Sequence, residues 1–161
     1  MIMDEGSNQV SHKKFTAPVA VHLMFVQHQQ VLLLRRYNTG YEDGKYSVVA
    51  GHLDGGEEVI QAAIREGKEE AGVKVDERDV QVVGVMHRKA VDERIDFFVR
   101  IHRWQGEIRN LEPHKCDDLR WFPLDALPDN MIPYVKHALK LGVEPMWFCS
   151  FGWDDPQDRL I

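Results

Sequence analysis

Three glutamates, Glu66, Glu69 and Glu70, are the residues whose types and spacing best suit chemistry. Positions i, i+3 and i+4 project from one side of a helix, where like charges repel by about 0.2–0.5 kcal/mol per pair. The opposite face of segment 57–71 is apolar or small, and a glycine-containing loop at 51–56 precedes it. Three carboxylates beside a backbone carbonyl suit Mg²⁺ or Mn²⁺, which activate water and neutralise phosphate charge. The alternative is a solvated charged face.

The rest of the chain must supply the elements that position these carboxylates. Apolar periodicity predicts strands at 19–26, 31–34, 47–50, 80–87, 95–101 and 118–122, and helices at 57–71 and 133–141. The first two strands are expected to pair as a hairpin, and Gly72 suits the residue that ends the first helix. Because strands and helices do not alternate strictly, this order predicts an α+β fold with a mixed β-sheet flanked by helices.

Composition and charge restrict the class of protein. The chain has 161 residues, 43% of them hydrophobic and 29% charged, as in one ordinary globular domain. We expect a loose leader at 1–15 and a single domain over 16–161. A formal net charge of −6, from 20 basic and 26 acidic residues, argues against a protein that coats nucleic acid.

The sequence also bears on the compartment. No apolar run approaches ~18 residues, and the N-terminal segment lacks the basic and apolar regions of a secretory signal. Two cysteines, Cys116 and Cys149, are too few for a disulfide scaffold. These features predict a cytoplasmic protein with neither a membrane nor a nucleic-acid polymer as its partner.

The segment 51–73 resembles the signature box of the Nudix hydrolases. Gly51 is followed after five residues by Glu57 and after seven more by the run REGKEEAGV, which meets every fixed position. Gly67 stands where the family has a bulkier apolar residue, and we expect tight packing under the helix there. The layout is similar to the MutT-like branch, which implies an α/β/α sandwich with a mixed sheet.

The resemblance implies a role for each residue of the box. It makes Glu66, Glu69 and Glu70 the ligands of Mg²⁺ or Mn²⁺. It adds the Gly51 carbonyl, the supporting Glu57, and a loop acid at Glu112 rather than Glu107. Arg65 would orient a neighbouring glutamate by a charge-assisted hydrogen bond. The general base is expected to be Glu66, with Glu112 as the alternate.

Three further residues are candidates for binding substrate. Arg36, with Arg35 beside it, resembles a phosphate-contacting arginine, for which the alternative is a solvated strand end. Asn130 resembles an asparagine that reads a purine edge, and a turn residue is the equally good alternative. The aromatic tail, Trp147 to Trp153, is expected to pack on the domain or a dimer partner, with a stacking wall for a base as the alternative.

The resemblance implies hydrolysis of a nucleoside diphosphate linked to another group. We expect a nucleoside triphosphate to be cleaved to a monophosphate and pyrophosphate. One alternative is a pyrophosphatase acting on ADP-ribose or a nucleotide sugar, and another is a non-catalytic nucleotide-binding sensor. The expected partner is a nucleotide, and the apolar tail leaves a homodimer open.

Overall fold

The computed structural model describes residues 12–154, so most of the expected leader, 1–11, lies outside the described residues. The elements follow in the order β1 (Val19–Gln27), β2 (Gln30–Arg36), β3 (Tyr46–Ser47), β4 (Val49–His52), α1 (Val59–Ala71), β5 (Val80–Lys89), β6 (Glu93–Ile101), β7 (Cys116–Pro123), α2 (Pro133–Leu141) and β8 (Trp147–Phe151). Neither of these helices is long and apolar enough to cross a membrane.

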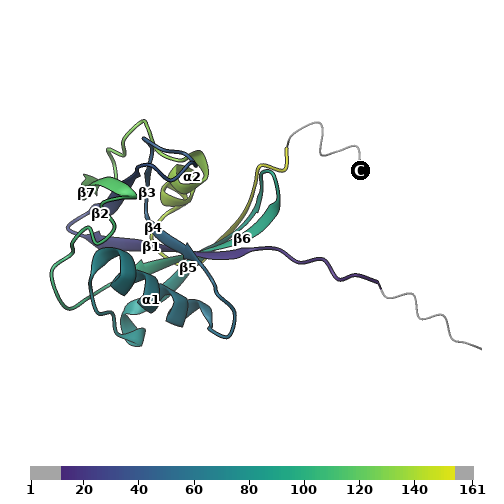
Figure 1. The fold of residues 1–161 in the computed structure, drawn as a ribbon, viewed down its shortest axis with the longest axis horizontal. Coiled ribbons are helices and arrows are strands. Elements are labelled where there is room, and N and C mark those ends of the chain that lie inside the picture. Colours follow the sequence, from purple (N-terminus) through teal and green to yellow (C-terminus); the bar gives the residue numbers. More distant parts are fainter. Residues whose placement is uncertain (1–11, 155–161) are drawn as a thin grey trace, which may run out of the picture.

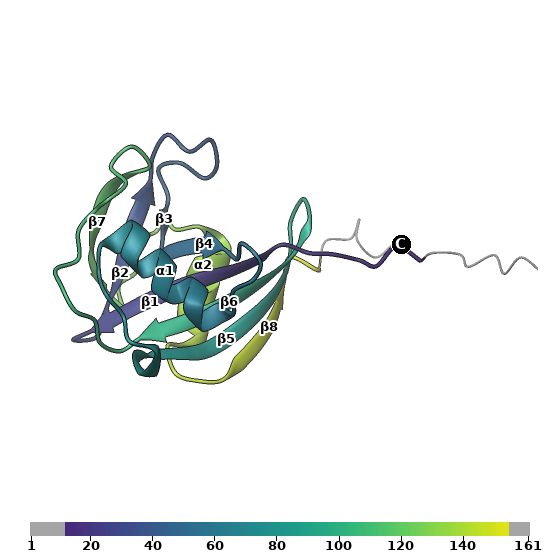
Figure 2. The same cartoon turned by 60° about the horizontal axis from the view of Figure 1, so that its bottom comes forward.

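The strands form a mixed sheet in the order β3-β2-β1-β6-β5-β8, with β4 paired to β1 and β7 to β2. The pairs β1–β6 and β5–β8 are parallel, and the others are antiparallel. Helices α1 and α2 cover opposite faces of this sheet (Figures 1 and 2). The expected α/β/α sandwich is therefore confirmed.

Strand β1 is apolar on both faces because it is covered from both sides. Its residues Val21, Leu23 and Phe25 belong to the core under α1, whereas Met24 and Val26 belong to the core under α2. Side chains alternate between the faces of a strand. This alternation places His22, which is 2% exposed, on the α2 side between apolar neighbours.

Two sequence predictions need correction. The strand expected at 47–50 is divided, because Tyr46–Ser47 pairs with β2 while Val49–His52 leaves for β1. The aromatic tail, for which no element was predicted, forms β8 and pairs with β5. A Cβ at Gly84 would lie 2.2 Å from the Trp147 ring, so the glycine is what lets this indole pack on the sheet.

Helix α1 begins two residues later than predicted and ends where predicted. Glu58 caps its first turn by accepting hydrogen bonds from the backbone N–H groups of Ile60 and Gln61. Gly72 ends it in the left-handed region at φ 70°, which glycine adopts without steric cost. A Cβ on Gly67 would lie 3.5–3.7 Å from Leu23, Phe25 and Val75, so alanine would fit and a larger side chain would not.

Candidate active site

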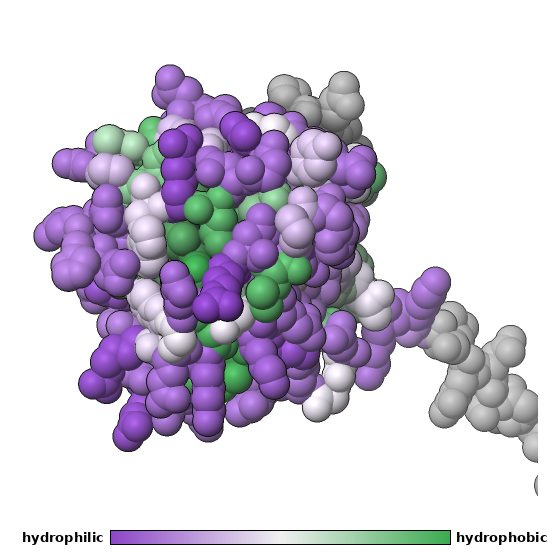
Figure 3. All heavy atoms as spheres, turned by 60° about the vertical axis from the view of Figure 1, so that its left-hand side comes forward, coloured by the Kyte–Doolittle hydropathy of each residue, from purple (hydrophilic) through white to green (hydrophobic). Residues whose placement is uncertain are grey.

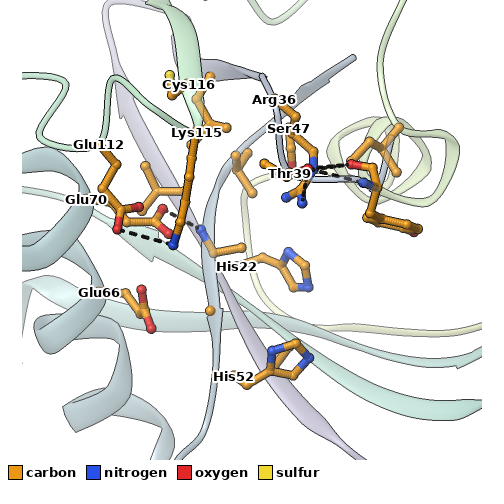
Figure 4. Close-up of a pocket in the computed structure, with 18 of the residues that line it drawn as sticks. His22, Arg36, Thr39, Ser47, His52, Glu66, Glu70, Glu112, Lys115 and Cys116 are labelled. Atoms are coloured by element: carbon orange, nitrogen blue, oxygen red, sulfur yellow. Dashed lines mark hydrogen bonds and ion pairs between the residues drawn. The ribbon is translucent and has the colours of Figure 1, made fainter. Parts of the chain in front are cut away.

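A cavity of about 700 Å³ is lined by residues of α1 and α2, of strands β1 to β7, and of the loops around 38–41 and 110–116. We call Glu66, Glu69, Glu70 and Glu112 its carboxylate end. The histidine end comprises His22, Arg88, Asp96 and Tyr134. Figure 4 shows Glu66, Glu70 and Glu112 gathered on one side, away from the His22 and His52 rings. On the face shown in Figure 3, hydrophilic residues surround an apolar patch.

The second half of α1 and strand β4 bring Glu66 against Gly51. The Glu66 side chain is buried, and a Cβ on Gly51 would lie 1.9 Å from its Oε1 atom. Only glycine can therefore occupy position 51 without displacing this carboxylate. One turn on, Glu70 accepts a hydrogen bond from the backbone N–H of Ala50 at 3.3 Å, which holds α1 to the same strand.

Arg65 organises the glutamates of the box. Its guanidinium donates to both carboxylate oxygens of Glu57, at 3.0 and 2.7 Å, in the bidentate geometry that suits arginine. It also donates to Glu66 Oε1 at 2.7 Å and to Glu69 Oε2 at 3.3 Å. The hydrogen bonds from Arg65 lower the pKa of the Glu57 carboxyl. Arg65 thus lies where an orienting residue is expected, and Glu57 faces Arg65 rather than the cavity.

The carboxylate end concentrates negative charge. Burial raises the pKa of Glu70 to about 8, with further contributions from the charges of Glu66 and Glu112. Burial also raises the pKa of Glu66, against the opposing effect of Arg65. Clustered carboxylates with raised pKa values are typical of functional sites.

Glu112 reaches this end from the loop between β6 and β7. The loop is held to the end of α1 by a hydrogen bond from the Arg109 N–H to the Ala71 carbonyl at 3.0 Å. Asn110, which the sequence analysis did not select, accepts from the Glu112 N–H at 3.1 Å and donates to the Cys116 carbonyl at 2.7 Å. Glu107 instead lies outside the cavity lining, 3.4 Å from Arg109.

A divalent ion such as Mg²⁺ needs several oxygen donors that converge on one point. Over residues 12–154, no group of three or more carboxylate, histidine or cysteine side chains converges at a spacing that holds an ion. The chemistry nevertheless fits, because the donors are all oxygens and four carboxylates share one end of a cavity. The Lys115 ammonium lies 3.8 Å from Glu112 Oε1. We conclude that the residues suit a hard cation, and that Arg65 holds one oxygen each of Glu66 and Glu69.

The structure separates the three residues suggested for substrate binding. Arg36 lines the cavity, where its guanidinium is fixed by the Tyr41 carbonyl at 2.7 Å and the Thr39 hydroxyl at 3.0 Å. Arg35 points elsewhere and forms two hydrogen bonds with Asp117. The Asn130 amide donates to the Gly44 carbonyl at 3.0 Å and is not part of the lining. Only Arg36 is therefore brought to the carboxylates' cavity.

The histidine end was not found from the sequence. Asp96 is fully buried and binds His22 Nε2 at 3.1 Å and Arg88 Nε at 2.7 Å. Burial opposes its charge, but the hydrogen bonds from His22 and Arg88 outweigh this and lower the pKa of Asp96. The only signal in the sequence was a histidine inside the apolar run of β1. Such a histidine is equally consistent with a structural core.

The aromatic tail does not line the cavity. The Trp147 ring packs against Phe98 with centroids 5.4 Å apart, and Trp153 donates to the His87 carbonyl at 2.9 Å. Phe148 is 68% exposed. The tail thus packs on the domain, as the first of its expected roles requires, and Phe148 leaves an apolar side chain at the sheet edge.

The comparison with known families decides the class. The NUDIX domain profile matches residues 15–141. The chain belongs to the NUDIX domain family. A crystal structure of a MutT NUDIX hydrolase from Burkholderia pseudomallei superposes with a TM-score of 0.72 at 26% identity, covering 78% of this chain and 98% of that one. The sequence-based recognition of a MutT-like Nudix pyrophosphohydrolase is therefore confirmed.

Two relatives carry names that describe an activity. An oxidized purine nucleoside triphosphate hydrolase of Danio rerio is 29% identical over 116 residues, which cover 71% of each protein. The NAD-capped RNA hydrolase NudC of Pseudomonas aeruginosa is 32% identical over 106 residues, covering 66% of this chain and 36% of that protein. A structure titled ADP compounds hydrolase is 25% identical, with a TM-score of 0.63. All three of these proteins are named as hydrolases.

Proposed function

We propose that this Nudix enzyme hydrolyses a nucleoside triphosphate to a nucleoside monophosphate and pyrophosphate, with Mg²⁺ or Mn²⁺ as its cofactor. The observation that carries the proposal is one cavity with four carboxylates at one end and Arg36 across from them. A polyphosphate would be repelled by the carboxylates alone, so cations must accompany it. The similarity to the triphosphate hydrolase of Danio rerio supports this choice of substrate.

Each residue of the site has a distinct task in this proposal. Glu66, Glu69, Glu70 and Glu112, with the Gly51 carbonyl, would hold the divalent ions, which neutralise phosphate charge and acidify a bound water. Arg65 binds one oxygen each of Glu66 and Glu69, which leaves their second oxygens for the ions, and Glu57 holds Arg65 in place through both of its own oxygens. Arg36 offers the remaining N–H groups of its guanidinium to phosphate oxygens.

Glu66 is the proposed general base, with Glu112 as the alternate. One Glu66 oxygen is bound by Arg65, and burial raises the pKa of this carboxyl toward the range in which a base works efficiently. Glu112 is more exposed and is paired only loosely with Lys115. Substitution of each by glutamine separates the two assignments, because replacing the general base should lower kcat far more than it changes KM.

A nucleotide sugar or ADP-ribose is the second candidate substrate. The similarity to the structure titled ADP compounds hydrolase favours it. A non-catalytic sensor is disfavoured, since Glu57, Glu66, Glu69 and Glu70 are all present in the box. The products distinguish these alternatives, because only a triphosphate yields pyrophosphate.

The experiment is a panel of nucleoside triphosphates, ADP-ribose and nucleotide sugars, each assayed with Mg²⁺ and with EDTA. Ion-exchange analysis of the products should show pyrophosphate and a monophosphate, formed only when the metal is present. Equal rates in EDTA would contradict the metal requirement. Turnover of ADP-ribose alone would contradict the triphosphate assignment.

Three wider predictions accompany the activity. We propose that 16–161 is one Nudix domain preceded by a leader at 1–15. We also propose a cytoplasmic location and a homodimer. Light scattering of the full chain tests the homodimer. The exposed side chain of Phe148 on the edge strand β8 supports the dimer.

A further inference from the structure

The histidine end of the cavity contains a buried polar atom without a partner. His22 is 2% exposed and lines the cavity, and its Nδ1 atom is fully buried without a hydrogen bond among the described residues. Buried polar atoms are nearly always paired, because an unpaired one costs about 1–3 kcal/mol. An unpaired atom in the wall of a ligand cavity is explained most directly by a ligand that pairs with it.

The neighbouring carboxylate determines which hydrogen-bonding role this atom has. Asp96 is ionised and can only accept, so the His22 Nε2 atom at 3.1 Å must carry the hydrogen. In the neutral imidazole, Nδ1 then carries a lone pair and no hydrogen. The neutral His22 ring therefore holds a buried hydrogen-bond acceptor, Nδ1, in the wall of the cavity.

Aromatic contacts restrict rotation of the His22 ring. It stacks on Phe98 with centroids 4.6 Å apart and contacts Tyr134 edge-on at 5.5 Å. Arg88 lies 3.9 Å over the Tyr134 ring and is bound to the second oxygen of Asp96. His22 is thus held from several sides, as a residue that selects a ligand must be.

We propose that His22 is a specificity-determining residue whose Nδ1 atom accepts a hydrogen bond from an N–H donor on the base of the nucleotide substrate. Asp96 is the positioning residue that fixes the tautomer. Arg88, a donor only, lies beside it on the same carboxylate and suits a carbonyl oxygen of the same base. This inference rests on the proposed function, because it takes the cleaved compound to be a nucleotide.

Two substitutions of His22 separate its two nitrogens. Glutamine places an amide near the Nε2 position, which keeps the contact with Asp96 and removes the Nδ1 acceptor. Asparagine places its amide oxygen near the Nδ1 position and gives up the contact with Asp96. His87→Gln is the matched control, since His87 lies on β5 outside the cavity lining and is partly exposed.

The experiment measures kcat and KM on pairs of triphosphates that differ by one donor of the base. The pairs are GTP and ITP for the 2-amino group, GTP and 1-methyl-GTP for N1–H, and 8-oxo-dGTP and dGTP for N7–H. In the wild type at least one pair should differ by about tenfold or more in kcat/KM. His22→Gln should bring that ratio close to one, mainly through KM, while His22→Asn and His87→Gln keep it.

Several results would overturn the role of His22. They are an unchanged ratio in a folded His22→Gln protein, an equal loss for every nucleotide, or a ratio that depends on removing an acceptor rather than a donor. If His22→Gln does not fold, measurements on the wild type and on His22→Asn decide the question. The inference is then overturned if all donor pairs agree within twofold in kcat/KM. If the wild type turns over no triphosphate, the proposed function fails, and the same pairs compared by calorimetric dissociation constants still test His22.

Discussion

The carboxylate end and the histidine end of the cavity differ in how their charges are compensated. At the carboxylate end, Glu70 accepts one backbone N–H, and its pKa is raised to about 8 by burial and by neighbouring carboxylates. At the histidine end, Asp96 is buried more completely, yet His22 and Arg88 lower its pKa. Burial thus raises or lowers a carboxyl pKa according to whether the fold also supplies donors. The proposed function adds cations at the first end, whereas the carboxylate of the second end is already paired within the protein.

The largest expected effect tests the internal pairing of the histidine end. Asp96→Asn leaves Arg88 buried beside a neutral amide, and removing one partner of a buried pair costs about 3–5 kcal/mol of unfolding free energy. Urea denaturation followed by circular dichroism measures this loss. The control is Asp117→Asn, which breaks the more exposed pair with Arg35 and should leave stability nearly unchanged. Equal effects of the two substitutions would contradict the comparison.

The next effect concerns the need for an added cation at the carboxylate end. Glu69 is 54% exposed, so Glu69→Gln should leave the fold intact and lower Mg²⁺-dependent turnover by about 100-fold. Steady-state kinetics over a range of Mg²⁺ concentrations measures it. Glu107→Gln, the same change on an exposed glutamate outside the cavity lining, is the control. Normal activity of Glu69→Gln would remove this residue from the metal site.

A pH series sharpens the contrast between the ends. Glu70 has a pKa raised from 4.5 to about 8, so the folded protein holds more protons than the unfolded chain between these values. Its contribution to stability therefore falls as the pH rises from 4.5 to 8, by at most about 1.4 kcal/mol per pH unit. Glu70→Gln should flatten this part of the stability curve measured without metal. A stability curve of unchanged slope would show that Glu70 is not the group responsible for this pH dependence.

The smallest effect lies under the carboxylate helix, away from both ends. Gly67→Ala should stabilise the protein by about 0.5–1 kcal/mol, because alanine favours a helix and its Cβ meets Leu23, Phe25 and Val75 at ordinary contact distances. Thermal unfolding measures the gain. Gly67→Leu, which exceeds the available space, should destabilise instead. A loss of stability in the alanine variant would show that the packing there is tighter than these distances indicate.

Local sequence determined much of the fold and one end of the cavity. The helix at 59–71, its glycine end at Gly72 and the hairpin β1–β2 follow from periodicity and from single-residue conformational preferences, which act over a few neighbouring positions. The spacing of Glu66, Glu69 and Glu70 places them on one helix face for the same reason. The box resemblance added Gly51 and Arg65, and the structure shows both against Glu66.

Only the tertiary structure decided which distant residues meet. His22 and Asp96 are 74 positions apart and come together because β1 pairs with β6 in one register, and a shift of one residue would turn either side chain to the other face. Strand pairing likewise sends adjacent Arg35 and Arg36 to different surroundings, one to Asp117 and the other to the cavity. Local spacing therefore determined the carboxylates, whereas long-range register determined the residues that face them.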